Sequence, residues 1–194
     1  MMKRFLLTLV LGSLFATLGE FLFCVLVRQS LTDYLFTLAA YPAILALTYF
    51  PLRWIERRMP SELSADMAVY AIAGLLGLAI EWFVIGNSPW ANPEANDLGM
   101  FAYWATVLAM PRLMLDTRPH LRPVRRAAAA AFAAYALGAL AVGVLTPQPQ
   151  RLFVLVWVVV LGYTGMNLFF FRAFRLVWKA ARDIASSVPA GSAV

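Results

Sequence analysis

The chain has 194 residues, of which 62% are hydrophobic and 13% are charged, and its formal net charge is +6. A soluble domain carries about 25% charged residues, so this composition excludes an ordinary soluble protein. The positive charge does not indicate a nucleic-acid partner, because no soluble basic face with interleaved aromatic residues accompanies it.

Six apolar segments follow one another along the chain, and each is long enough to cross a bilayer core of about 30 Å as a helix. They predict an all-α integral membrane protein in which six transmembrane helices form one bundle and one domain, residues 1–182. We expect residues 183–194, which are small and polar, to be a disordered cytoplasmic tail. The expected spans are residues 5–27, 34–52, 65–86, 98–115, 127–146 and 151–173.

The first apolar segment follows Lys3 and Arg4, so a signal peptide is its alternative interpretation. The apolar run continues to Val27, and no small-residue cleavage site follows it. We therefore predict a transmembrane helix. The chain has one cysteine, Cys24, and one histidine, His120. With so few ligands of these types we expect no metal and no cofactor.

The basic residues are distributed unevenly between the two sides of the predicted bundle. All 16 Lys and Arg residues except Arg28 and Arg151 lie at the N-terminus, after the second and fourth spans, or at the end of the sixth. Cytoplasmic loops collect Lys and Arg, and the even number of spans agrees, so we expect both termini in the cytoplasm. We expect the protein to reside in the inner membrane of a bacterium, where membrane lipids are its first partners.

A weak internal repeat with a period near 60 residues suggests three tandem helical hairpins. Glu20 and Glu81 stand about 60 positions apart, as do segments 51–56 and 111–116, which each begin with proline and end with an acid. The third hairpin, formed by spans five and six, lacks the matching acid. Parallel repeats of this kind occur in transporters.

Two glutamates lie within apolar helices and are predicted to face the interior of the bundle. Gly12 shares a helical stripe with Glu20, and Gly74 and Gly77 share one with Glu81. Small residues on a membrane helix mark places where another backbone comes close. Both helices run outward, and each glutamate is one to two turns below its outer end. The two carboxylates are therefore expected at matching depths, lining one chamber.

A loop rich in Asn, Pro and Trp, residues 86–97, follows the second glutamate. Proline restricts the backbone and asparagine favours hydrogen-bonded turns, so we expect a stiff cap over a polar chamber that opens outward. The alternative is a compact connection with interfacial anchors, and the glutamates would then serve only to join helices. The predicted ligand-binding residues are Glu20, Glu81, Trp82, Asn87, Trp90 and Asn92, with Arg28 and Arg151 as the outer-side cations.

Three functions are compatible with this pattern. The first is binding or transport of a small molecule or lipid, because buried acids can hold a cationic or hydrogen-bonding ligand. The second is an intramembrane enzyme in which Glu20 and Glu81 are the catalytic acid and base for a lipid or isoprenoid. The third is a scaffold subunit that assembles with a protein partner or with copies of itself.

Overall fold

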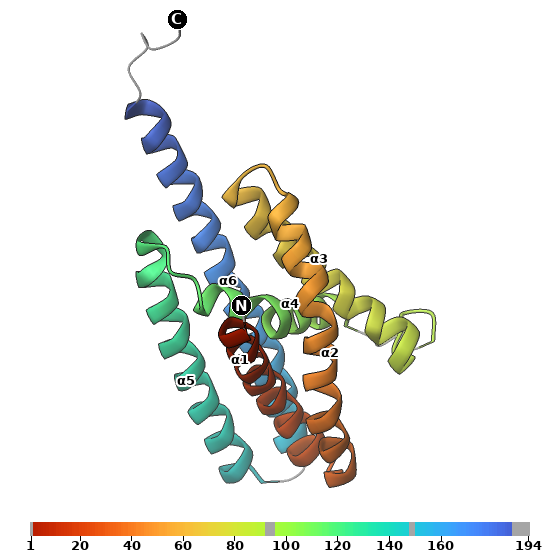
Figure 1. Cartoon of the computed structure of the whole chain (residues 1–194). Helices are drawn as coiled ribbons and strands as arrows, with labels where there is room; N and C mark the ends of the chain where they lie inside the picture. The colour runs from red at the N-terminus through yellow and green to blue at the C-terminus, as the bar shows by residue number, and fades with distance from the viewer. Residues whose placement is uncertain (1, 92–95, 148–149, 188–194) are drawn as a thin grey trace, which may run out of the picture.

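The computed structural model describes residues 2–91, 96–147 and 150–187, which form a helical bundle (Figure 1). Helices α1, α2, α5 and α6 run alongside one another, whereas α3 extends to one side and α4 returns through the middle of the molecule. The elements are α1 Met2–Glu20, the π-helical segment η1 Phe21–Val27, α2 Leu31–Arg58, α3 Glu62–Ile80, the π-helical segment η2 Glu81–Ile85, α4 Asp97–Met114, the 3-10 turn η3 Pro119–Leu121, α5 Arg122–Leu145 and α6 Gln150–Ser187.

Five helical segments of the described chain are long and apolar enough to cross a membrane. The fourth predicted span is present as α4, an 18-residue helix, but it is not among the five segments that are long and apolar enough to cross a membrane. Residues 102–111 of α4 are buried without interruption, so this helix is enclosed by the others. The five segments are Met2–Val27, Leu31–Arg58, Glu62–Ile85, Pro119–Leu145 and Phe153–Ile184.

Side-chain caps explain where several helices begin. The hydroxyl of Ser30 accepts a hydrogen bond from the backbone N–H of Asp33 at the start of α2. Ser61 and Ser64 form a reciprocal capping box at the start of α3. The side chain of Asn96 accepts from the first turn of α4. Such caps satisfy backbone N–H groups that have no partner within the helix, and they therefore fix the residue at which each of these helices begins.

The last helix is longer than the sequence predicts. The sixth span was expected to end at residue 173, but α6 has 38 residues and continues to Ser187. Residues 183–187, expected to be disordered, are therefore helical, and residues 188–194 lie outside the described residues. Extending an existing helix avoids the cost of nucleation, which explains why a short polar segment can remain helical.

The predicted close approach at the small residues is confirmed. A Cβ atom added at Gly12 would lie 2.5 Å from the side chain of Leu45 on α2. One added at Gly77 would lie only 2.0 Å from Trp104 on α4. The stripes of α1 and α3 that carry the glutamates therefore face neighbouring helices, and the glycines let those helices pack closely.

Candidate functional site

The carboxylate of Glu20 is surrounded by donors from two other helices. Its Oε1 atom lies 2.5 Å from the hydroxyl oxygen of Tyr41 on α2 and 3.1 Å from that of Tyr103 on α4. The two hydroxyls are 2.8 Å apart, so the three oxygens form a triangle through which protons can be shared. The thiol of Cys24, one turn along the same helix, donates to Oε2 at 3.3 Å. Glu20 thus joins α1, α2 and α4.

The carboxylate of Glu81 has a separate set of donors. The indole Nε1 of Trp104 donates to it at 2.9 Å, and the side-chain amide of Asn87 donates at 3.3 Å. Glu81 is only 7% exposed and Trp104 is completely buried. The close packing of Trp104 against Gly77 positions the indole beneath the carboxylate. Hydrogen bonds are what make a buried polar group tolerable.

The two carboxylates belong to one continuous group of side chains, which we call the carboxylate–aromatic cluster: Glu20, Glu81, Tyr41, Tyr103 and Trp104. The ring of Tyr41 lies 5.4 Å from that of Trp104, and the ring of Tyr103 lies 5.8 Å from it, measured between centroids. Two consecutive residues of the enclosed helix α4 therefore donate to different glutamates: Tyr103 donates to Glu20, and Trp104 donates to Glu81. The rings of Tyr41, Tyr103 and Trp104 thus connect the surroundings of the two carboxylates.

Both glutamates stand where an α-helix changes to a π-helix. Glu20 ends α1 directly before η1, and Glu81 is the first residue of η2. Segments of π-helix are rare, and they occur often at functional sites because they redirect side chains and carbonyls. The repeat seen in the sequence has a structural counterpart here. In each of the first two hairpins, a glutamate at such a junction accepts a hydrogen bond from an aromatic side chain on the following helix.

The loop after Glu81 is anchored at both ends by predicted site residues. The indole nitrogen of Trp82 donates to Asp97, at the start of α4, at 3.0 Å. The ring of Trp90 packs edge-to-face on Trp82 with a centroid distance of 5.4 Å, and 66% of Trp90 is exposed. Asn92 lies outside the described residues. The loop therefore starts beside Glu81 and returns beside Trp82.

The two arginines that the sequence predicts on the outer side, Arg28 and Arg151, do not join the cluster in the described part of the chain. The guanidinium of Arg28 lies over the ring of Phe23 at 4.7 Å. Arg151 donates instead to the carbonyl of Thr146 at 3.0 Å, at the end of α5. Each arginine thus contacts a group close to it in sequence. Such a local contact orders the long side chain less than a contact with a distant carboxylate would.

The aromatic donors of the cluster are residues of the candidate site that the sequence did not single out. Tyr41 and Tyr103 would be read as interface or packing residues, and nothing distinguished Trp104 from the other tryptophans. One signal was available: Tyr41 and Tyr103 stand about 60 positions apart, like the two glutamates. A search for residues that recur with the same period would have found them.

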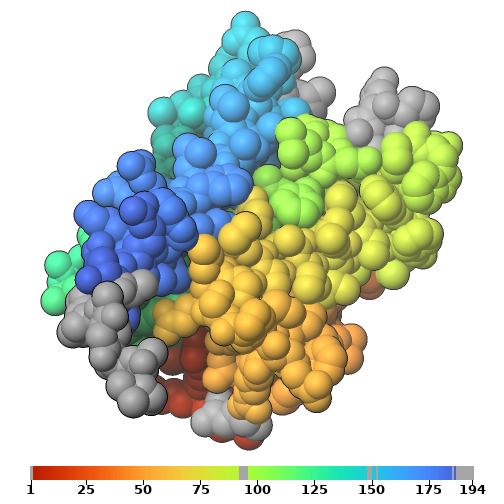
Figure 2. All heavy atoms as spheres, turned by 90° about the horizontal axis from the view of Figure 1, so that it is seen from above, coloured from red at the N-terminus to blue at the C-terminus, as the bar shows by residue number. Residues whose placement is uncertain are grey.

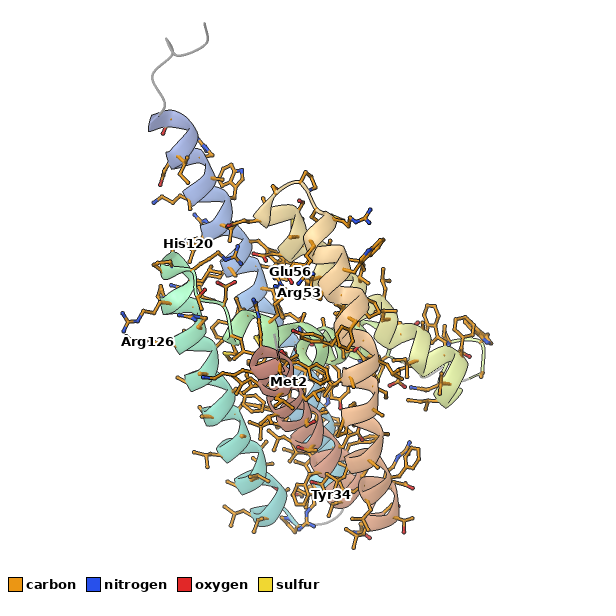
Figure 3. The ribbon with its side chains drawn as sticks, in the orientation of Figure 1. Met2, Tyr34, Arg53, Glu56, His120 and Arg126 are labelled. Carbon is orange, nitrogen blue, oxygen red and sulfur yellow. The ribbon has the colours of Figure 1, made fainter. Side chains whose placement is uncertain are left out.

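A second polar group, the arginine cluster, lies toward the other end of α2 from Tyr34, where Figure 3 shows Arg53 and Glu56 close together. Asp66 on α3 is 6% exposed and accepts from Arg112 at 2.5 Å and from Arg118 at 2.7 Å. The cluster consists of Arg53, Arg112 and Arg118 with Glu56, Glu62, Asp66 and Asp116.

The charges at the edge of the arginine cluster shift each other's protonation. Burial tends to raise the pKa of the Asp116 carboxyl, but hydrogen bonds from the side chain and backbone N–H of Arg118 outweigh it and lower this pKa. Burial tends to lower the pKa of Arg118, and its bonds to Asp116 and Asp66 raise it overall. Both groups are therefore held in their charged forms, as expected for a structural ion-pair network.

Comparison of this chain with protein-family models, with curated proteins and with solved structures finds no match. The five apolar helices of this chain fit an integral membrane protein. Inside the bundle, two glutamates accept hydrogen bonds from phenol and indole groups, and a network of ion pairs occupies a separate region.

Proposed function

We propose that this protein binds a small molecule or lipid for transport, and that Glu20 and Glu81 contact the ligand. The observation that carries this proposal is the convergence of both acids on one cluster of aromatic donors from α2 and α4. A charge at the centre of a bilayer costs about 3 kcal/mol on insertion scales, and intramembrane acids commonly mark substrate or proton pathways.

The two acids would play different parts in binding. Glu20 is half-buried and is the carboxylate that a ligand would meet first, whereas Glu81 is 7% exposed. The ammonium or hydroxyl group of a ligand can donate a hydrogen bond to Glu20 in place of the one from Tyr41 or Tyr103. Trp104 connects this event to Glu81, because its ring packs near Tyr41 and its nitrogen donates to Glu81. The outward-opening chamber under residues 86–97 is part of this proposal.

The test is mass spectrometry of ligands that remain bound when the protein is purified in mild detergent. Glu20→Gln and Glu81→Gln are compared with wild type and with Glu62→Gln, a matched control in which an exposed side chain on the first turn of α3 is changed. We expect a bound species in wild type and in the control, and its loss from the other two. Folded Glu20→Gln and Glu81→Gln proteins that retain the species would show the proposal to be wrong.

A second candidate function is an intramembrane acid–base enzyme acting on a lipid or isoprenoid. The 2.5 Å separation between the Tyr41 hydroxyl and Glu20, with Tyr103 next in line, favours it, because such a chain can deliver or remove a proton. The same mass spectrometry distinguishes the two functions. A bound lipid whose mass changes on incubation supports the enzyme, and an unchanged species supports transport.

The scaffold function makes the opposite prediction about the acids. Glu20 and Glu81 would then serve only to hold helices together, and partners or further copies of the chain would bind elsewhere. Glu20→Gln and Glu81→Gln proteins that fold and support the cell as well as wild type does would favour this alternative. Variants that fail to fold would assign the two glutamates to helix packing.

We infer that the arginine cluster faces the cytoplasm of a bacterium, with both termini on that side of the inner membrane. The accumulation of arginines at the ends of α2 and α4 supports this orientation. Reporter fusions test it directly. A reporter that is active only in the cytoplasm should work after residue 60 and at the C-terminus, and should be inactive within residues 86–97. The reverse pattern would overturn the orientation.

A further inference from the structure

A small hollow with a basic lining lies between α1, α2 and α4, beside the arginine cluster. Its volume is about 40 Å³. Figure 2, seen from above, shows the start of α1 (dark red) at the bottom of a recess beside the end of α2 and the start of α3 (orange). The polar side chains that line the hollow are Arg4, Thr8, Thr48, Tyr49, Arg53, Glu56 and Arg112.

Positive charge exceeds negative charge in this lining. Glu56 is the only carboxylate among the lining residues, and it is shared by Arg53 at 2.7 Å and Arg112 at 3.1 Å. Arg4 has no hydrogen bond or ion pair with any other side chain in the part of the chain that the structure describes. Three guanidinium groups therefore face a space that holds one acid.

A neighbouring acid helps to balance the charge of Arg112 but not that of Arg4. Asp66 also pairs with Arg112, but it accepts from Arg118 as well and lines a separate, smaller hollow. The Nε of Arg112 is buried and finds no partner within the described residues. Because that nitrogen is enclosed, the guanidinium of Arg4 is the one that offers unpaired donors to the hollow among the described lining residues, and these donors call for an anion.

We propose that this hollow binds the phosphate group of an anionic phospholipid. Guanidinium groups bind phosphate through paired, charge-assisted hydrogen bonds, and basic pockets between membrane helices bind lipid headgroups. By the same measure of volume, one water molecule needs about 10–15 Å³. The hollow, at about 40 Å³, therefore accommodates a phosphate group but no nucleotide or sugar. Leu6, Leu47 and Phe50 lie within two positions of lining residues in sequence, and their exposed side chains suit acyl chains. The site is separate from Glu20 and Glu81.

The experiment measures thermal unfolding of the detergent-solubilised protein with added phosphatidylglycerol, phosphatidylcholine or inorganic phosphate. Arg4→Gln removes the guanidinium that has no acid partner, and Arg57→Gln is the control, because Arg57 is exposed on α2 and does not line the hollow. We expect phosphatidylglycerol, but not phosphatidylcholine, to raise the midpoint of wild type and of Arg57→Gln. Arg4→Gln should need about tenfold more phosphatidylglycerol for the same shift.

Each outcome bears on the proposal. Equal responses of Arg4→Gln and Arg57→Gln to phosphatidylglycerol would overturn it, as would equal stabilisation by the two lipids. A shift produced by inorganic phosphate alone and lost in Arg4→Gln would keep the site but overturn its assignment to a lipid. Arg4→Lys retains the charge without the paired donors, so it should show an intermediate response. This variant carries the test if Arg4→Gln does not fold.

Discussion

The substitution Gly77→Ala tests how the structure positions the second glutamate. The new methyl carbon would lie 2.0 Å from both Cβ and Cγ of Trp104, far inside van der Waals contact. Trp104 is completely buried and cannot move into free space, so α3 and α4 must separate or the indole must turn. Either change lengthens the 2.9 Å hydrogen bond from Trp104 to Glu81.

Three contributions set the expected magnitude. Overpacking a buried site costs about 1–3 kcal/mol. An interhelical hydrogen bond in a membrane protein contributes about 0.6–1.7 kcal/mol. Replacing glycine by alanine within a helix returns about 1 kcal/mol of helix propensity. We therefore expect Gly77→Ala to lower the free energy of unfolding by about 1–4 kcal/mol.

The assay is equilibrium unfolding of the purified protein in mixed micelles with increasing SDS. Gly138→Ala is the matched control, because an added Cβ there meets no described atom within 4 Å, and its stability should be unchanged or slightly higher. In a Trp104→Ala background, Gly77→Ala should cost much less, since the clash has been removed. Equal stabilities of the Gly77→Ala and Gly138→Ala proteins would refute the reasoning.

Three further predictions use the same unfolding assay. Tyr41→Phe removes one donor to Glu20 and should cost about 0.6–1.7 kcal/mol, and an unchanged stability would mean that this hydrogen bond contributes nothing. Asp66→Asn removes a buried carboxylate that two partly buried guanidiniums share, although each keeps another acid partner, and should cost about 1.5–3 kcal/mol, above the loss in Glu62→Gln. The Asp116 carboxyl has a lowered pKa in the folded protein, so its stabilising effect is complete above the unfolded value of about 3.9 and is lost as the pH falls below it. Asp116→Asn should therefore weaken the acid dependence of stability, and a pH profile identical to that of wild type would contradict this.

The sequence alone predicted the helices and much of their spacing. Apolar runs of the length of a bilayer core become helices because every backbone polar group must find a partner within its own segment. It did not predict that α4 is enclosed by the other helices. The hydropathy of a segment depends on its residues, whereas its burial depends on which other segments surround it.

The sequence also identified Glu20 and Glu81 as inward-facing acids, since each shares a helical stripe with glycines that allow close packing. The tyrosine and tryptophan donors could not be identified in the same way. An aromatic residue in a membrane helix has the same sequence signature whether it faces lipid, headgroups or an acid on another helix. Only the rotation and position of α2 and α4 decide which of these it contacts.

The clearest division between sequence and tertiary structure concerns the arginines. Their uneven distribution is a property of the sequence and predicts the orientation of the chain in the membrane. That Arg112 pairs with Asp66, and that Arg4 remains beside a basic hollow without an acid, follows from the packing of α1, α2, α3 and α4. Charge pairing acts over a few ångströms, so it is decided by which helix ends meet in the folded protein.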